Sequence, residues 1–283
     1  MKLMSFARGG APSWGAAVDG GVADLGKAMG GKYPTLRAVL EAGALGEAAE
    51  AARGAKADAS LDDVTFLPVI PNPDKVLCVG LNYKSHIEET GRSDSDYPVI
   101  FTRFTNTQIG HGEAMVRPNN STAYDYEGEL ALVIGSTARH VKEADALKVI
   151  AGYSCYNDGS IRDWQRHTHQ FTPGKNFPAT GGFGPWMVTA DEIPDPASMH
   201  LKTILNGEVM QDATTDLLVF SVPFLIEYIS SFTELVPGDV IITGTPGGVG
   251  FKRDPQVFMK PGDTVEIEID KIGTLVNSIA DEA

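Results

Sequence analysis

The stretch YDYEGELALVIG, residues 124–135, places a carboxylate at every second position and then becomes apolar. Asp125, Glu127 and Glu129 would lie on one face of a β-strand, spaced by about 6 to 7 Å. Beyond Glu129 the residues of both faces are apolar, so the strand is expected to continue into the interior. Crowded carboxylates in such a place repel one another and lose hydration unless cations compensate them. The pattern leaves two interpretations open, a metal or active site and a solvated strand end.

A second stretch, TVEIEID at residues 264–270, keeps the same alternation to its end. Its valine and isoleucines alternate with acidic residues throughout, which is typical of a strand with one buried and one solvated face. The two stretches are therefore expected to differ. The second should be half-buried, whereas the first should be buried on both faces beyond Glu129.

The 283-residue chain is long enough for one large domain with a small appendage. Its hydrophobic share of 42% and charged share of 21% are those of a soluble globular protein. The net charge of −14 argues against a nucleic-acid or anionic-membrane surface, although a locally positive pocket can still accept a small anionic substrate. No apolar run approaches the roughly 20 residues that span a bilayer. No secretory h-region opens the chain and both cysteines lie in apolar runs, so a reducing cytoplasm is expected.

Residues 1–70 are expected to form a small N-terminal domain or arm. The segments 33–43 and 46–54 have helical spacing with glycine at their ends, and a proline-marked extended linker follows. This part of the chain is distinct in composition from the remainder.

Residues 71–283 are expected to form the main domain, because most of their periodic segments are short and strand-like. Helices are predicted at 141–150 and 222–232, and Asn206-Gly207 predicts a hairpin turn. The fold class is therefore mainly β with a few helices (α+β).

The segment NYKSHIEETG, residues 82–91, places His86 and Glu89 on one face of a helical turn. A carboxylate in this position can fix the tautomer of the imidazole and raise its basicity, which suits a general base near neutral pH. The alternative is an ordinary surface pair on a short helix.

Asp158 follows an apolar strand-like stretch at a turn marked by asparagine and glycine, 31 residues beyond Glu127. It is a candidate third oxygen ligand to accompany Glu127 and Glu129. Two or three carboxylates, with water and substrate in the remaining positions, suit Mg²⁺ or Mn²⁺.

Two further motifs carry weaker signals. His167 and His169 form an H-x-H that can ligate Zn²⁺, but no third nitrogen ligand is specified nearby, so a loop is the favoured interpretation. The segment GTPGGVGFK, residues 244–252, lacks the spacing of a phosphate-binding loop. It is expected to be a tight turn whose backbone groups can line a pocket.

The order and spacing of these segments resemble the fumarylacetoacetate hydrolase family. The resemblance covers residues 75–279 and rests on VGLNYKSHIEE, FTRF, DYEGELALVIG, GYSCYNDGSIRDWQ, GKNF, LNGEVMQ and PGDVIITGTPGGVG, followed by KPGDTVEIEIDKIGTLVNSI. It implies a mixed β-roll or distorted barrel, usually a homodimer, with a divalent metal in a cleft. The metal of the family is most often Mg²⁺.

By resemblance, Glu127, Glu129 and Asp158 would hold the metal, whereas Asp125 would lie behind them or at the surface. His86 with Glu89 looks like a pair that activates water. Lys175 looks like the lysine that stabilises an oxyanion, and Gln165 looks like the residue that positions the water. Weaker candidates, as residues of the substrate pocket, are Arg162, Tyr83 and Thr245.

The chain departs from the family pattern in three places. No carboxylate precedes the histidine, so the chain resembles the smaller branch with three carboxylates. Arg103 stands in FTRF where many members have lysine, and its planar guanidinium is expected to grip a substrate carboxylate. Gly128 lies between the two glutamates, where it is expected to bring the backbone nearer to the ligand.

The leading interpretation is hydrolysis of a C–C bond in a 1,3-diketo acid of the acylpyruvate or fumarylpyruvate type, through a metal-stabilised enolate. The water-activating pair favours hydrolysis, because a decarboxylase needs no activated water. The alternatives are decarboxylation of oxaloacetate or a related β-keto acid, and hydration or isomerisation of unsaturated 2-keto acids in aromatic catabolism. A non-catalytic binding protein with the same fold also stays open.

Overall fold

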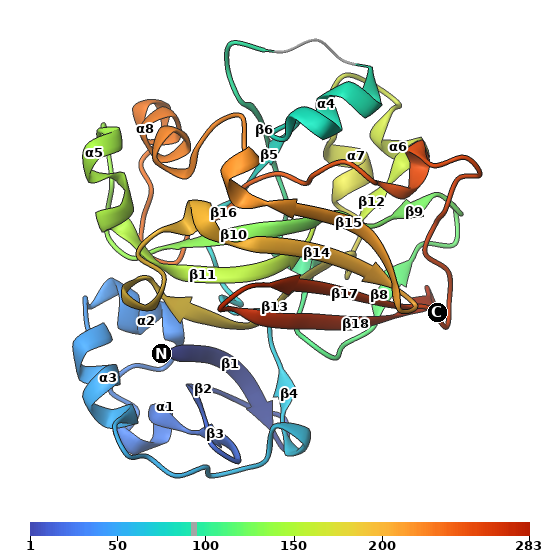
Figure 1. Ribbon diagram of the computed structural model, residues 1–283. Helices are drawn as coiled ribbons and strands as arrows, with labels where there is room; N and C mark the ends of the chain where they lie inside the picture. The colour runs from blue at the N-terminus through green and yellow to red at the C-terminus, as the bar shows by residue number, and fades with distance from the viewer. Residues whose placement is uncertain (92–94) are drawn as a thin grey trace.

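The computed structural model describes residues 1–91 and 95–283 (Figure 1). Its strands form an 11-stranded, a five-stranded and a two-stranded sheet, with short helices between the strands. Parallel and antiparallel neighbours occur together, so the sheets are mixed. The mainly β fold with some helices is therefore confirmed. Over the described residues the sheets are open, and none closes into a barrel.

The N-terminal region begins with an antiparallel sheet that the sequence did not indicate. Residues Leu3 to Phe6 of its first strand are all buried, so both faces are covered and no alternation marks the strand. The glycines that made this opening look irregular are its turn residues, with Gly9 and Gly10 at φ +57° and +82°. The strands are β1 (Lys2–Arg8), β2 (Ala11–Val18) and β3 (Gly21–Ala23).

Short helices follow these strands. The side chain of Thr35 accepts a hydrogen bond from Ala38 N and so caps the second of them. The last two helices confirm the helical spacing at 33–43 and 46–54. The helices are α1 (Leu25–Ala28), α2 (Leu36–Glu41) and α3 (Leu45–Ala52).

The N-terminal region is joined to the remainder by hydrogen bonds and by a shared core. In Figure 1 its elements lie below the other strands, and β1 pairs with β13 through Leu3 and Met187. Trp14 and Leu36 belong to the same buried cluster as Ala131 of the central strand. The sheet and the core thus continue across residue 70, where the domain boundary stays a prediction.

The 11-stranded sheet forms the centre of the molecule, and its main path runs β3-β2-β1-β13-β11-β10-β16-β5-β6. The strand β16 pairs with β5 in parallel, and β10 is antiparallel to both of its neighbours. Besides β1, β2 and β3, the strands of this sheet are β4 (Thr65–Phe66), β5 (Val76–Gly80), β6 (Val99–Thr102), β7 (Gln108–Ile109), β10 (Gly128–Ile134), β11 (Ile150–Asn157), β13 (Gly181–Thr189) and β16 (Val240–Ile242).

The five-stranded sheet runs β15-β14-β17-β18-β8. Its hairpin turn at Asn206 and Gly207, with φ of +52° and +83°, confirms the Asn-Gly prediction. Its strands are β8 (Met115–Arg117), β14 (His200–Leu205), β15 (Glu208–Thr214), β17 (Thr264–Ile269) and β18 (Gly273–Asp281), while β9 (Tyr124–Asp125) and β12 (Ser160–Ile161) form the two-stranded sheet.

The strand β10 is buried along its whole length, as predicted. Leu130 and Leu132 on one face belong to the core that also includes Ile267 of β17. Ala131 and Val133 on the other face belong to the core shared with the N-terminal region. The strand therefore lies between two cores, and the acidic residues at its start have apolar neighbours further along both faces.

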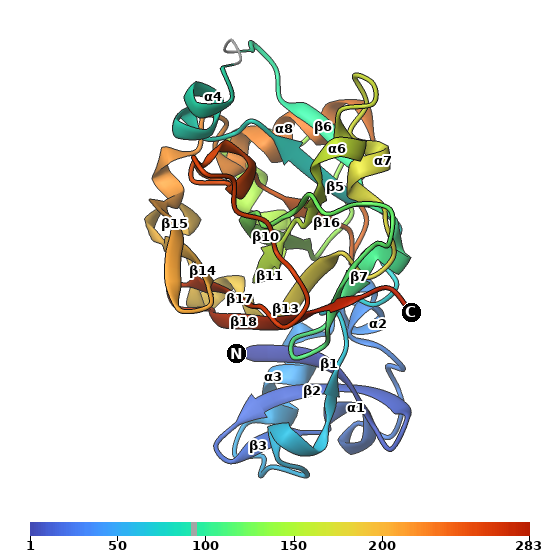
Figure 2. The ribbon, with the colours of Figure 1, turned by 90° about the vertical axis from the view of Figure 1, so that its right-hand side faces the viewer.

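Three of the remaining helices carry predicted site residues. Helix α8 has the predicted bounds, and the Ser221 side chain caps it by accepting from Phe224 N. The helix predicted at 141–150 is shorter than expected, because a 3-10 turn at Leu147–Val149 leads into the buried strand β11. No described helix is long and apolar enough to cross a membrane. The helices are α4 (Lys84–Thr90), α5 (Glu143–Ala146), α6 (Arg162–Gln165), α7 (Thr172–Lys175) and α8 (Val222–Phe232). In Figure 2, α4, α6 and α7 lie at the end of the molecule opposite the N-terminal region.

Candidate active site

Three buried carboxylates meet at the start of β10. One oxygen of each of Glu127, Glu129 and Asp158 lies within 4.8 Å of the others. The pairing of β10 with β11 sets Gly128 opposite Asn157, and Asp158 N donates to the Glu127 carbonyl at 2.8 Å. Residues that are 31 positions apart in the sequence thus become neighbours through strand register. Their role as metal ligands stays a prediction, and their geometry is compatible with it.

The close approach of these buried negative charges favours a bound cation. Burial, followed by the charges of Asp158 and Glu127, raises the pKa of Glu129 well above its usual range. Glu129 accepts a hydrogen bond from Gly244 N at 2.5 Å, and no described lysine or arginine forms an ion pair with it. A buried carboxylate with two acidic neighbours and no paired cation fits a hard divalent ion.

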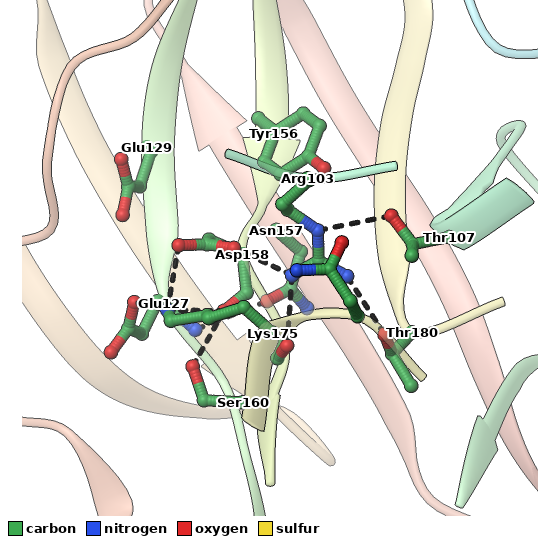
Figure 3. A network of polar contacts seen from close by, with 12 residues as sticks. Arg103, Thr107, Glu127, Glu129, Tyr156, Asn157, Asp158, Ser160, Lys175 and Thr180 are labelled. Atoms are coloured by element: carbon green, nitrogen blue, oxygen red, sulfur yellow. Dashed lines mark hydrogen bonds and ion pairs between the residues drawn. The ribbon is translucent and has the colours of Figure 1, made fainter. Parts of the chain in front are cut away.

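Lys175 lies between two of the carboxylates (Figure 3). Its Nζ is 2.6 Å from Glu127 Oε2 and 2.6 Å from Asp158 Oδ2, and the side chain is 1% exposed. Burial by itself would raise the pKa of Glu127, but Lys175 and Arg162 hold it at about 2. The ammonium group pairs directly with these two acids, whereas Glu129 is left without a paired cation among the described residues.

His86 and Glu89 form the expected pair on helix α4. His86 Nδ1 is 2.7 Å from Glu89 Oε1, and Glu89 Oε2 accepts from Gly248 N at 2.9 Å. Glu89 therefore orients the imidazole and also fastens α4 to the glycine-rich turn. With Nδ1–H donating to the carboxylate, the other ring nitrogen is left as the acceptor.

A cavity of about 460 Å³ connects these groups. Glu127, Glu129 and Lys175 form its floor, and His86 faces it from α4. Apolar residues, Phe101 among them, also line it. The remaining lining residues are Val79, Gly80, Leu81, Thr90, Arg162, Gln165, Arg166, Thr168, His169, Phe171, Thr245, Phe251 and Lys252.

Residues 75–280 match the family model described as fumarylacetoacetate (FAA) hydrolase, C-terminal. The chain belongs to the fumarylacetoacetate hydrolase family. It is 38% identical over 267 residues to the mitochondrial oxaloacetate tautomerase Fahd2a of Rattus norvegicus, covering 93% of this chain and 85% of that protein. These matches show membership of an enzyme family, and the family model covers residues 75–280.

Two solved structures of the family extend the comparison over the full length of both chains. A 5-carboxymethyl-2-hydroxymuconate delta-isomerase from Mycobacterium smegmatis has 32% identity and a TM-score of 0.78. A maleylpyruvate hydrolase from Sphingobium sp. SYK-6, in complex with manganese(II) and pyruvate, has 28% identity and a TM-score of 0.82. The names include a tautomerase, an isomerase and a hydrolase, so membership of the family establishes the kind of enzyme without selecting one reaction.

Three further predicted residues line the cavity of this family member: Gln165, Arg162 and Thr245. Arg162 contacts Asp125 at 2.8 Å and Glu127 at 2.7 Å, and its Nη1 donates to Gln165 Oε1 at 3.0 Å. The guanidinium is thus held by the protein's own acids. Asp125, for which two positions were open, is fully buried and not at the surface, and it also accepts hydrogen bonds from three backbone N–H groups.

Arg103 differs from its prediction as a substrate ligand, because its guanidinium does not line the cavity. Its Nη1 lies 2.6 Å from Asp158 Oδ1, and its other nitrogens donate to Thr107 and Thr180 (Figure 3). The side chain is completely buried. Arg103 therefore holds a carboxylate of the protein rather than one of a substrate.

Two other expectations also change. Tyr83 is 1% exposed and lies outside the cavity lining, with its hydroxyl unpaired among the described residues. A Cβ at Gly128 would lie 2.2 Å from Thr203 Oγ1 and 3.2 Å from Ile267 Cδ1, on the face opposite the glutamates. The glycine is required by the close approach of the five-stranded sheet, and not by a ligand.

The H-x-H motif does not form a zinc site. His169 lines the cavity, whereas His167 packs against the ring of Trp164 at 4.8 Å. Over the described residues, the carboxylate triad is the only group of three or more acidic, histidine or cysteine side chains close enough to share an ion.

The sequence missed Arg166, Phe251 and Lys252 as cavity residues. The glycine-rich turn at 244–252 was expected to line a pocket, and it does so through Thr245 as well as through these last two residues. Arg166 directly follows the end of α6, where no motif distinguishes it from a surface arginine.

Proposed function

We propose that the protein is a metal-dependent enzyme that enolises a small 2-keto acid, and that its reaction is keto–enol tautomerisation of oxaloacetate or a close analogue. The observation that carries the proposal is the oriented base His86, which lines the same cavity as Glu127 and Glu129 of the carboxylate triad. The 38% sequence identity to an oxaloacetate tautomerase supports this choice of substrate. For this reason we propose tautomerisation ahead of the hydrolysis that the sequence motifs favoured.

The residues that would hold the metal are Glu127, Glu129 and Asp158, and Mg²⁺ and Mn²⁺ suit their oxygen ligands. When bound, such an ion would supply Lewis-acid polarisation of the 2-keto group. The manganese complex of the related hydrolase supports a divalent ion in this family.

The chain's own residues can perform the proton transfer. Glu89 accepts the Nδ1 proton of His86, so Nε2 can remove a proton from C3 of the keto form. The C3–H bond breaks, the electron pair forms the C2–C3 double bond, and a proton reaches the former keto oxygen. Lys175, beside the floor carboxylates, supplies positive charge next to the reacting end of the substrate.

Hydrolysis of an acylpyruvate is the second candidate, favoured by Gln165, which lines the same cavity as His86. In that reaction His86 would take a proton from water instead of from carbon, and the water oxygen would add to the distal carbonyl. The C–C bond would then break to release a carboxylic acid, with its electron pair passing to the enolate of pyruvate, which takes the proton back. The related maleylpyruvate hydrolase supports this alternative. A homodimer and a cytoplasmic location stay proposals.

The experiment uses chelator-treated protein to which Mg²⁺ or Mn²⁺ is added back. Tautomerisation should accelerate the loss of enol absorbance while total oxaloacetate is retained. Decarboxylation would instead release pyruvate, and hydrolysis would appear only as loss of an acylpyruvate. Glu127→Gln should remove the activity. Turnover of none of these substrates with either metal, or full activity of Glu127→Gln, would contradict the proposal.

A further inference from the structure

A buried glutamine contacts the residue that lies between the two glutamates of the floor. Gln211 of β15 is the last residue of the segment LNGEVMQ and is 1% exposed. Its Oε1 accepts from Gly128 N at 2.9 Å and from Thr203 Oγ1 at 2.6 Å. Its Nε2 donates to Thr245 Oγ1 at 2.7 Å and to the Pro246 carbonyl at 2.8 Å. The amide therefore makes all four of its hydrogen bonds with the protein.

These contacts hold Gly128 at both of its backbone polar groups. Its N–H donates to Gln211, and its carbonyl accepts from Thr245 Oγ1 at 3.0 Å. Because the Thr245 hydroxyl donates to Gly128, it accepts from Gln211, so one amide supports both contacts. Glu127 and Glu129 are the chain neighbours of this glycine, whose backbone dihedrals set the relative direction of their side chains. A glycine restricts these dihedrals less than any other residue, so the direction depends on the groups that hold it.

Gln211 also holds the glycine-rich turn, because the two turn residues that it contacts lie between two others that donate to acids of the site. Gly244 N donates to Glu129 Oε2, and Gly248 N donates to Glu89 Oε2. The first acid belongs to the floor, and the second orients the base. The amide therefore lies where the floor, the turn and helix α4 are connected.

We propose that Gln211 is a positioning residue for the metal site, which holds Gly128 against the turn so that Glu127 and Glu129 can share one ion. The inference rests on the proposed function, because these carboxylates must bind a divalent ion. An amide suits this task, since it offers acceptor and donor positions together without adding a charge to the buried cluster.

The test measures the affinity of chelator-treated protein for Mn²⁺ by calorimetry. Gln211→Met keeps the length of the side chain but removes its hydrogen bonds, and it should weaken Mn²⁺ binding by about 10–100-fold, as is typical when the support of metal ligands is lost. Gln211→Glu keeps an oxygen for Gly128 N and should bind the ion more tightly than Gln211→Met. As a matched control, Thr215→Val removes a buried hydroxyl that is hydrogen-bonded to Pro196 and Met199, outside the cavity lining, and should leave the affinity unchanged.

Denaturant titration of the same variants separates positioning from a general loss of stability. Gln211→Met and Thr215→Val should both be destabilised, because each leaves buried polar groups without partners, but only the first should bind Mn²⁺ more weakly. If Gln211→Met does not fold, Thr245→Val removes only the hydroxyl that holds Gly128 O and should weaken Mn²⁺ binding by about tenfold.

The affinity measurement also separates this inference from the proposed reaction. If no keto acid turns over but Gln211→Met binds Mn²⁺ more weakly while Thr215→Val does not, the positioning role stands and the proposed reaction fails. Unchanged affinity in Gln211→Met, or an equal loss in Thr215→Val, overturns the positioning role whether or not oxaloacetate turns over. Wild-type protein that binds no Mn²⁺ would overturn both.

Discussion

The sequences at β10 and β17 share an alternation of acidic with other residues, but the fold buries the acids of one and leaves those of the other partly exposed. In β17, Val265, Ile267 and Ile269 are buried while Glu266 and Glu268 are half-buried. Lys202 of the neighbouring strand stands directly opposite Glu268. This acidic face therefore has water and a cross-strand cation to stabilise it.

The acids at the start of β10 are much less exposed to water. Glu127 and Glu129 are 4% and 2% exposed, because cores on both sides of the strand exclude solvent. Their charges must be compensated from within, by Lys175 and Arg162 and by a divalent ion if the proposal is correct. Alternation of acidic and apolar residues alone therefore does not distinguish a binding site from a solvated face. The distinction depends on whether a hydrophobic core also covers the acidic face of the strand.

The largest effect should come from matched substitutions on the two strands. Glu129→Gln should reduce kcat/KM about 1,000-fold or more, because the buried cluster loses an ionic ligand. Glu268→Gln should leave activity within about twofold, since this residue lies on the half-exposed face. Metal binding by calorimetry and steady-state kinetics check both. Equal losses in the two variants would remove the distinction between the strands.

A second substitution tests the support behind the β10 site. Arg103 holds Asp158 Oδ1 at 2.6 Å and leaves Oδ2 toward Lys175 and the triad. Arg103→Met should weaken metal binding by about 10–100-fold, because the carboxylate loses the group that orients it. Arg103→Lys should recover part of the loss. Unchanged metal affinity in the methionine variant would show that Arg103 does not orient this ligand.

A third substitution tests the close approach of the two sheets. Gly128→Ala should lower the free energy of unfolding by about 1–3 kcal/mol, because the new Cβ would lie 2.2 Å from Thr203 Oγ1. Gly46→Ala, in helix α3 with no atom within 4 Å, should instead raise it by about 0.5–1 kcal/mol. Denaturant titration measures both, and a destabilised Gly46→Ala would show that the comparison reflects more than local space.

The smallest expected effect concerns His111, which lies beside the five-stranded sheet. Burial lowers the pKa of His111, whose Nδ1 accepts from Val276 N at 3.1 Å, and Val276 is the residue that pairs with Glu266. Because the unfolded histidine binds a proton below about pH 6.5 while the folded one resists it, this contribution to stability is lost as the pH falls from there toward the folded pKa. His111→Asn should reduce the pH dependence of unfolding between about pH 5 and 7. An unchanged slope would assign that dependence to other groups.

Much of the local structure could be predicted from the sequence. The spacing of His86 and Glu89 requires only one helical turn, and the Asn-Gly hairpin requires only two residues. The N-terminal strands were missed because β1 has buried residues on both faces. Arg103 was assigned to the substrate because its buried partner, Asp158, is 55 residues away along the chain.

The sequence by itself determined which residues could share a strand face or a helical turn, because those relations depend on backbone periodicity. It placed two carboxylates at the start of β10 and a base with its orienting acid on α4. Only the tertiary structure decided that Asp158 lies beside Glu127 and that solvent is excluded from both faces of β10. These relations depend on strand register and on packing between distant segments, which no local pattern specifies.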